Sequence, residues 1–156
     1  MVKRVALISD IHGRKLHEKV LRCLDKCDYI ICAGDTEDLS IIAQLEAIKP
    51  LTVVRGNCDW RPWADDLPKD AVLKVEDVNI YVIHNLRSLS FEPDPQRIDV
   101  VVYGHTHIFK QYYENDVLYI NPGSVSEPRG GQSAHMYVLE INGKSIRTHS
   151  VYVDVD

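Results

Sequence analysis

The first third of the chain alternates continuously apolar runs with segments of helical periodicity. The apolar runs are residues 5–9, 29–33 and 51–55, and the periodic segments are residues 15–26 and 38–49. Apolar strands that alternate with helices are typical of a parallel sheet whose two faces are both covered. We therefore predict that this part of the chain forms an α/β unit with parallel strands.

The rest of the chain is rich in strand patterns and poor in helical ones. The predicted strands are residues 71–75, 78–83, 100–103, 108–114, 117–120, 135–141 and 145–153. Asn115-Asp116 and Asn142-Gly143 fit the tight turns of β-hairpins. Together the two patterns predict two β-sheets packed face to face, with helices outside at least one of them.

Composition predicts one domain, residues 1–156, because 45% of the residues are hydrophobic and no Pro- or Gly-rich linker interrupts the chain. The net charge is -5 and no basic run exceeds two residues, so the basic stripe that bulk nucleic-acid binding requires is absent. No apolar run is long enough for a signal peptide or a membrane span. Cys23, Cys27, Cys32 and Cys58 lack zinc-knuckle spacing, so we expect reduced, buried thiols and a cytoplasmic protein.

Residues that can bind a metal ion follow five of the predicted strands directly. They are Asp10, His12, Asp35, Asn57, His84, His105 and His107. Because ligands bind beyond the carboxyl ends of strands in open α/β sheets, we expect these side chains to converge. Residues two apart in an extended chain face the same side, which places His12 with Asp10. The glycines at 34, 56 and 104 suggest positive φ or close backbone approach beside them.

This mixture of carboxylate, amide and imidazole ligands suits manganese, iron, cobalt, nickel or zinc. Seven ligands exceed the four of one tetrahedral zinc and fit two ions that share a carboxylate. Taken alone, Asp35 with Thr36 fits a helix N-cap equally well, and a single histidine is usually a surface or packing residue. Capping does not account for histidines at three strand ends. His17, His135 and His149 lie outside the pattern, and we expect them to be surface or packing residues.

The ordered motifs resemble the calcineurin-like metallophosphoesterase superfamily, and most closely its small, single-domain bacterial and archaeal phosphodiesterases. They are D-I-H at 10–12, G-D at 34–35, G-N-C-D at 56–59, His84, G-H-T-H at 104–107, N-P-G-S at 121–124 and P-R-G at 128–130. The resemblance implies a four-layer α/β/β/α sandwich of two mixed sheets, an α/β (α+β) fold.

The resemblance also implies a binuclear metal centre and an activity. The first ion takes Asp10, His12, Asp35 and His107, and the second takes Asp35, Asn57, His84 and His105. Asp59 is expected to orient the Asn57 amide, and the expected catalytic residues are Asn57, Cys58, Asp59 and His84. The implied reaction is hydrolysis of a small phosphodiester by a hydroxide bridging two divalent ions, with manganese favoured and nickel, iron, cobalt, zinc or magnesium as alternatives.

The sequence departs from the superfamily at two positions. The usual G-N-H-[DE] carries a histidine thought to protonate the leaving oxygen, and here Cys58 replaces it. This predicts a preference for good leaving groups, such as those of aryl phosphodiesters, because nearby metals would lower the thiol pKa further. Asn85 stands where glycine is common, and asparagine tolerates left-handed backbone. Arg129 is either a phosphate ligand or an ordinary surface arginine.

Two functions stay open. The favoured one is catalysis, since all seven ligands are intact. The other is a non-catalytic metal-binding interaction scaffold, as in the retromer subunit that resembles this branch. Neither a P-loop nor a dinucleotide-binding motif is present, so a nucleotide-binding module lacks support. The biological substrate, the native metal and the oligomeric state, a homo-oligomer included, are left open.

Overall fold

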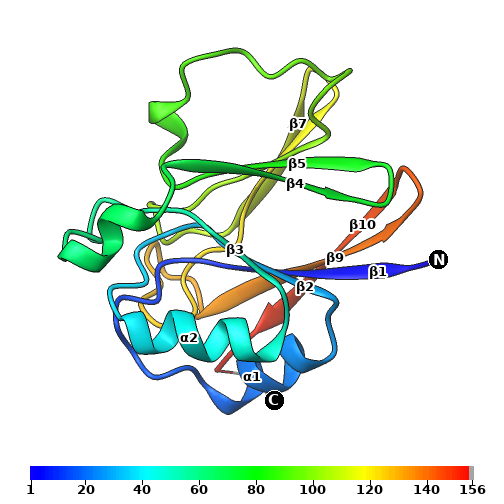
Figure 1. The fold of residues 1–156 in the computed structure, drawn as a ribbon. Helices are drawn as coiled ribbons and strands as arrows, with labels where there is room; N and C mark the ends of the chain where they lie inside the picture. The colour runs from blue at the N-terminus through cyan, green and yellow to red at the C-terminus, as the bar shows by residue number, and fades with distance from the viewer. Residues whose placement is uncertain (155–156) are drawn as a thin grey trace.

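The computed structural model describes residues 1–154 and contains two five-stranded sheets packed face to face (Figure 1). The last two residues of the predicted 1–156 domain lie outside the described residues. The first sheet has the order β10-β9-β1-β2-β3 and the second β4-β5-β6-β8-β7. Both sheets are mixed, as predicted.

In the first sheet, β1, β2 and β3 are parallel, and β9 and β10 add an antiparallel hairpin. These strands are β1 (Lys3–Ile8), β2 (Tyr29–Cys32), β3 (Leu51–Val53), β9 (His135–Asn142) and β10 (Ser145–Tyr152). In the second sheet, β5, β6 and β8 are parallel, and β4 and β7 lie antiparallel at the two edges. Its strands are β4 (Asp70–Val75), β5 (Val78–Ile83), β6 (Val100–Val102), β7 (Lys110–Glu114) and β8 (Val117–Asn121).

Helices α1 (Glu18–Asp25) and α2 (Leu39–Ile48) cover the outer face of the first sheet (Figure 1). Their apolar stripes pack on the outward residues of β1 and β2, with Val20 and Leu45 fully buried. Side chains cap both helices: the His17 ring accepts from the Lys19 amide, and the Asp38 carboxylate accepts from the Ser40 amide. Helix α1 therefore begins at residue 18, later than predicted.

A core of aliphatic side chains fills the space between the sheets. Leu7 and Ile31 of the first sheet pack with Val82 and Ile120 of the second, and all four are buried. Apolar residues on both faces of β1 are accounted for in this way, since one face meets the helices and the other meets the second sheet.

The outer face of the second sheet lacks an α-helix among the described residues. Between α2 and residue 154, the helical turns are the 3₁₀ helices η1 (Pro62–Asp66) and η2 (Leu86–Ser88). Leu86, Leu89 and Ile98 pack on Tyr81 and Tyr119 of this face. The predicted four-layer sandwich is confirmed, and its fourth layer is a short 3₁₀ turn with irregular chain.

One predicted hairpin turn is confirmed and another lies one residue away. Asn115 and Asp116 have φ of 50° and 63° and join the paired residues of β7 and β8. Asn142 still pairs with Ser145, so the loop between β9 and β10 is Gly143 and Lys144. Gly143 takes the positive φ of 60° that this turn requires.

All four cysteines are free thiols, with Cys27 and Cys32 buried and Cys23 and Cys58 half-buried. Neither α-helix among residues 1–154 has the length and apolar character needed to traverse a lipid bilayer.

Candidate metal centre

The seven predicted ligands come together where strands of both sheets end. Asp35 follows β2, and its Oδ2 lies 3.2 Å from His84 Nε2, which follows β5, and 3.7 Å from His12 Nε2. Asn57 Oδ1 lies 2.9 Å from His84 Nε2 and 3.1 Å from His105 Nδ1. The predicted convergence of residues from distant parts of the chain is present in the structure.

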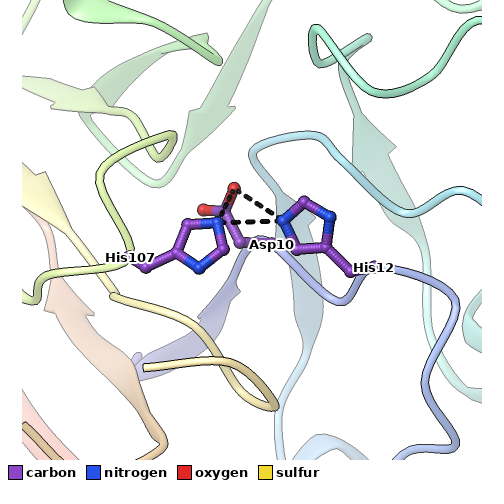
Figure 2. Close-up of side chains that lie close together, drawn as sticks. All are labelled: Asp10, His12 and His107. Atoms are coloured by element: carbon purple, nitrogen blue, oxygen red, sulfur yellow. Dashed lines mark hydrogen bonds and ion pairs between the residues drawn. The ribbon is translucent and has the colours of Figure 1, made fainter. Parts of the chain in front are cut away.

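Asp10, His12 and His107 form one part of the site, here called the first ligand group (Figure 2). The two Nε2 atoms lie 2.9 Å apart. Asp10 Oδ1 is 3.5 Å from His107 Nε2 and 3.8 Å from His12 Nε2. Figure 2 shows both rings turned towards the carboxylate from opposite sides.

The hydrogen bonds of the two Nδ1 atoms determine whether the converging Nε2 atoms of His12 and His107 carry a proton. His12 Nδ1 lies 2.6 Å from Glu37 Oε2, and His107 Nδ1 lies 2.6 Å from the Glu127 carbonyl oxygen. An acceptor at Nδ1 requires the proton there, so Nε2 of each neutral ring presents a lone pair. Asp10 Oδ1 is buried and has no hydrogen-bond partner. Two lone pairs and a carboxylate oxygen therefore face one another, an arrangement that a cation stabilises.

Asp35, Asn57, His84 and His105 form the second ligand group. His84 Nδ1 donates to the Ala33 carbonyl at 2.6 Å, which leaves Nε2 for a cation or, in its absence, a second proton. Asp35 Oδ1 accepts from the Cys58 amide at 2.7 Å, and its Oδ2 faces histidines of both groups. Asp35 thus lies where the resemblance placed a bridging ligand.

The spacing of these atoms fits divalent metal ions. Nitrogen and oxygen ligands lie about 2.0–2.2 Å from zinc-sized ions, so neighbouring ligands on one ion are roughly 3–3.5 Å apart. The separations within the first group are 2.9, 3.5 and 3.8 Å. The chemistry of the donors and the unpartnered Asp10 oxygen agree with this spacing.

Burial and nearby charges have opposite effects on the pKa values of the Asp10 and Asp35 carboxyls and of His84. Burial raises the pKa of the Asp10 carboxyl, although His84 and His107 oppose the change. Burial also acts to raise the pKa of Asp35, but its hydrogen bond and charge interaction with His84 lower it overall. Burial acts to lower the pKa of His84, and the same interaction with Asp35 outweighs it and raises that pKa. A proton and a metal cation therefore compete for the Asp35–His84 pair.

Most of the ligands have left-handed backbone. The φ angles are 56° at Asp10, 53° at His12, 57° at Asp35, 76° at His105 and 61° at His107. His12 lies with Asp10 as predicted, but the extended backbone assumed for D-I-H is wrong, because both residues have left-handed φ angles. His105 and His107 also diverge, one to each ligand group. Such angles are strained for residues with a side chain and cluster at functional sites.

Glycines make room for these turns, as the sequence predicted. Gly34 has a φ of +104°. Gly56 and Gly104 are needed for close approach: a Cβ on Gly56 would clash with Asp35 Oδ1, and one on Gly104 would clash with Ser9 Oγ.

Glu37 is the site residue that the sequence reasoning missed. Its carboxylate holds His12 Nδ1, and its own φ is 64°. A carboxylate behind a metal-binding histidine fixes the ring orientation and raises the basicity of the ligand. The available signal was its position two residues after Asp35 in the same loop.

Asp59 has a different role from the one predicted. Its Oδ2 accepts from the amides of Asp35 and Gly56, and its Oδ1 accepts from the amide of Glu37. The Asn57 amide nitrogen instead contacts Cys58 Sγ at 3.5 Å. Asp59 therefore fixes the loops that carry the ligands, and the expected contact with the Asn57 amide is absent.

The N-P-G-S segment forms hydrogen bonds with the backbone of two ligand loops. The Asn121 amide donates to the Gly104 carbonyl at 3.1 Å, and the Ser124 hydroxyl donates to the Asp10 carbonyl at 2.7 Å. Both side chains are buried. The segment thus fixes the backbone at two ligand loops.

Cys58 and Asn85 are the two departures from the family pattern, and for Asn85 the structure differs from expectation. Cys58 lies beside His12 and Glu37. Burial and the carboxylates of Asp35 and Glu37 raise the pKa of its thiol to about 11, and the lowering expected from bound metals stays a prediction. Asn85 has a φ of −114°, so the explanation by left-handed backbone is wrong. Its side chain caps η2 by accepting from the Arg87 amide.

Residues 4–144 match the calcineurin-like phosphoesterase superfamily domain. The chain belongs to this family. A probable metallophosphoesterase of Methanocaldococcus jannaschii is 31% identical over 140 residues, covering 80% of this chain and 69% of the relative. The phosphodiesterase YfcE of Escherichia coli is 31% identical over 107 residues, covering 61% of this chain and 55% of YfcE.

The fold of this calcineurin-like phosphoesterase also occurs in proteins of lower sequence identity. The crystal structure of Vps29 from Entamoeba histolytica, complexed with zinc, superposes with a TM-score of 0.73 at 19% identity. The match covers 96% of this chain and 99% of Vps29. At this identity the likeness establishes the shared fold.

Proposed function

We propose that this protein is a divalent-metal-dependent phosphodiesterase acting on small phosphodiesters. The observation that carries the proposal is the convergence of ligand atoms in two groups, with Asp10 Oδ1 unpartnered and Asp35 Oδ2 near histidines of both groups. The first ion would be held by Asp10, His12, Asp35 and His107, and the second by Asp35, Asn57, His84 and His105. Manganese is the favoured ion, with nickel, iron, cobalt, zinc and magnesium as alternatives for this donor set.

Each part of the site has a definite task in this proposal. Divalent ions bound here would supply a nucleophile from water at neutral pH and neutralise charge on phosphoryl oxygens. Glu37 and the Ala33 carbonyl hold the His12 and His84 rings so that Nε2 faces inwards. The Asp59 carboxylate fixes the loops on which Asp35 and Glu37 lie, so the ligands are arranged before substrate arrives.

Cleavage of diesters with good leaving groups is favoured over cleavage of monoesters. The relative YfcE is itself named a phosphodiesterase. Cys58 replaces the family's histidine, and burial and the carboxylates of Asp35 and Glu37 raise the pKa of its thiol to about 11. A site without a well-matched general acid depends on the leaving oxygen's own stability, so we expect aryl phosphodiesters to react faster than alkyl monoesters.

Hydrolysis of bis(4-nitrophenyl) phosphate by chelator-stripped protein tests the proposal. Adding manganese, nickel, zinc and magnesium separately should restore turnover with at least one of them. His84→Ala should abolish it, whereas His149→Ala, on exposed strand β10, should not change it. Turnover that survives chelation, or that His84→Ala leaves unchanged, would refute the metal-dependent mechanism.

The scaffold hypothesis predicts a different result from the same experiment. In this hypothesis the protein, which shares its fold with Vps29, binds metal ions without hydrolysing a substrate. The complete ligand set and the cavities beside the second ligand group favour catalysis. Stoichiometric metal binding with no hydrolysis of any diester would favour the scaffold.

A further inference from the structure

Two cavities border the second ligand group. Asn57 and His84 line one cavity of about 330 Å³, and His105 lines another of about 470 Å³. Asn85 lines both. Cavities of this size accept small-molecule ligands. A phosphodiester has two organic arms, so a phosphate held at the second ligand group would find a separate cavity for each arm.

The lining of these cavities is basic. Arg55 and Lys69 line the smaller one, Arg87 and Arg129 line the larger one, and neither lining includes an acidic residue. The chain as a whole has 23 acidic and 18 basic residues. The cavity linings are therefore positively charged although the chain as a whole is negatively charged. They favour a substrate with negative charge beyond the scissile phosphate.

The two arginines of the larger cavity are anchored by their main chains beside ligand residues. The Arg87 amide donates to the Asn85 side chain at 3.0 Å, and the Arg129 amide donates to the His107 carbonyl at 3.2 Å. Their guanidinium groups have no hydrogen bond or ion pair within residues 1–154, whereas Arg55 pairs with Asp65 at 3.2 Å. A free guanidinium binds two phosphate oxygens at once.

We propose that Arg87 and Arg129 bind a second phosphate group of the substrate. The preferred substrate is then a phosphodiester that carries a further phosphate on one arm. A nucleotide arm has this chemistry, with its sugar against the Leu86 side chain and its terminal phosphate at the two arginines. The inference rests on the proposed phosphodiesterase function and narrows its substrate class.

Two chromogenic diesters test the inference. They are the 4-nitrophenyl ester of thymidine 5′-phosphate and the same ester with a phosphate on the 3′-hydroxyl. We expect kcat/KM to be about tenfold higher for the phosphorylated ester, the gain typical of a charge-assisted contact. Arg87→Gln and Arg129→Gln should each move this ratio towards one. Arg147→Gln removes the same charge from exposed strand β10 and should keep the wild-type ratio.

The outcomes separate this inference from the proposed function. Equal kcat/KM for the two esters in an active enzyme overturns the second phosphate site and leaves the phosphodiesterase standing. Inactivity on both contradicts the phosphodiesterase, and calorimetric titration of the chelator-stripped protein then decides. Tighter binding of thymidine 3′,5′-bisphosphate than of thymidine 5′-phosphate, lost in Arg87→Gln, supports the site. Equal binding of the two nucleotides overturns it.

Discussion

The two ligand groups differ in burial and in what holds their side chains. In the first group, Asp10 and His107 have side chains 0% and 2% exposed, and a carboxylate or carbonyl fixes each ring. In the second, Asn57 is exposed and its amide nitrogen has only a 3.5 Å contact with Cys58. The cavities adjoin the second group. We infer that the first group is built to retain an ion, and the second to present an ion to substrate.

Asp35→Asn should affect both ions, because Asp35 Oδ2 lies close to His12 of the first group and to His84 of the second. We expect hydrolysis to fall by roughly 10²–10³-fold or more, as when a main source of charge stabilisation is removed. Metal analysis after dialysis should find both ions depleted. Asn57→Ala, by contrast, should deplete the second ion and leave the first. Full retention of both ions in Asp35→Asn would contradict the bridging role.

Glu37→Gln should weaken the first group selectively. Loss of a carboxylate behind a histidine ligand typically costs about 10–100-fold in metal affinity. Competition with a fluorescent chelator measures the change. Glu127→Gln is the matched control, since Glu127 reaches His107 through its main-chain carbonyl and its carboxylate pairs with Arg14 at the surface. Equal effects of the two substitutions would show that general negative charge matters, and not the contact with His12.

Acidification should weaken the second group. The pKa of His84 is raised despite its burial, because Asp35 favours the imidazolium. Below that raised pKa an ion must displace the proton, so affinity should increase with pH by up to about tenfold per unit and level off above it. Metal titrations at several pH values follow the change. A metal affinity that does not change between about pH 6 and pH 8 would contradict the competition between proton and metal ion.

Cys58→His should have the smallest effect. A histidine here would stand beside the Glu37 carboxylate, which favours a protonated ring able to donate to a leaving oxygen. General acids built for their site contribute about 10²–10⁴-fold, and one placed in an unadapted loop should recover only a few-fold gain on alkyl esters. Rates on 4-nitrophenyl esters should stay unchanged. Cys58→Ala controls for side-chain size, and an equal gain there would remove the missing-acid explanation.

The sequence predicted what depends on strand order. Apolar runs located the strands, and the rule that parallel strands end together placed Asp10 and Asp35 at one edge of the first sheet. His84 follows β5 of the second sheet, so its place beside Asp35 also depends on how the two sheets face each other. It did not predict how the chain turns there. His12 and His107 have left-handed backbone where their main chains hydrogen-bond to neighbouring loops, and a two-residue spacing cannot distinguish this from an extended chain.

The contacts that hold the ligand side chains and their loops in place could not be predicted from the sequence either. The contact of Glu37 with His12 joins residues 25 positions apart, and Asp59 holds the amides of Asp35 and Glu37 in another loop. Such contacts depend on the angles at which loops leave the sheet. The residues of the fourth layer could not be located for a related reason: residues 86–98 have no helical period, yet Leu86 and Ile98 cover the second sheet.

The left-handed ligand positions restrict which metals the protein can be adapted to bind. Asparagine, aspartate and histidine are the non-glycine residues that adopt such angles most readily, and the five ligands with positive φ are all aspartate or histidine. An exchange of His107 for cysteine would keep a ligand atom but lose that conformational tolerance. A shift towards thiolate-preferring ions would therefore need a rebuilt loop as well as a new side chain.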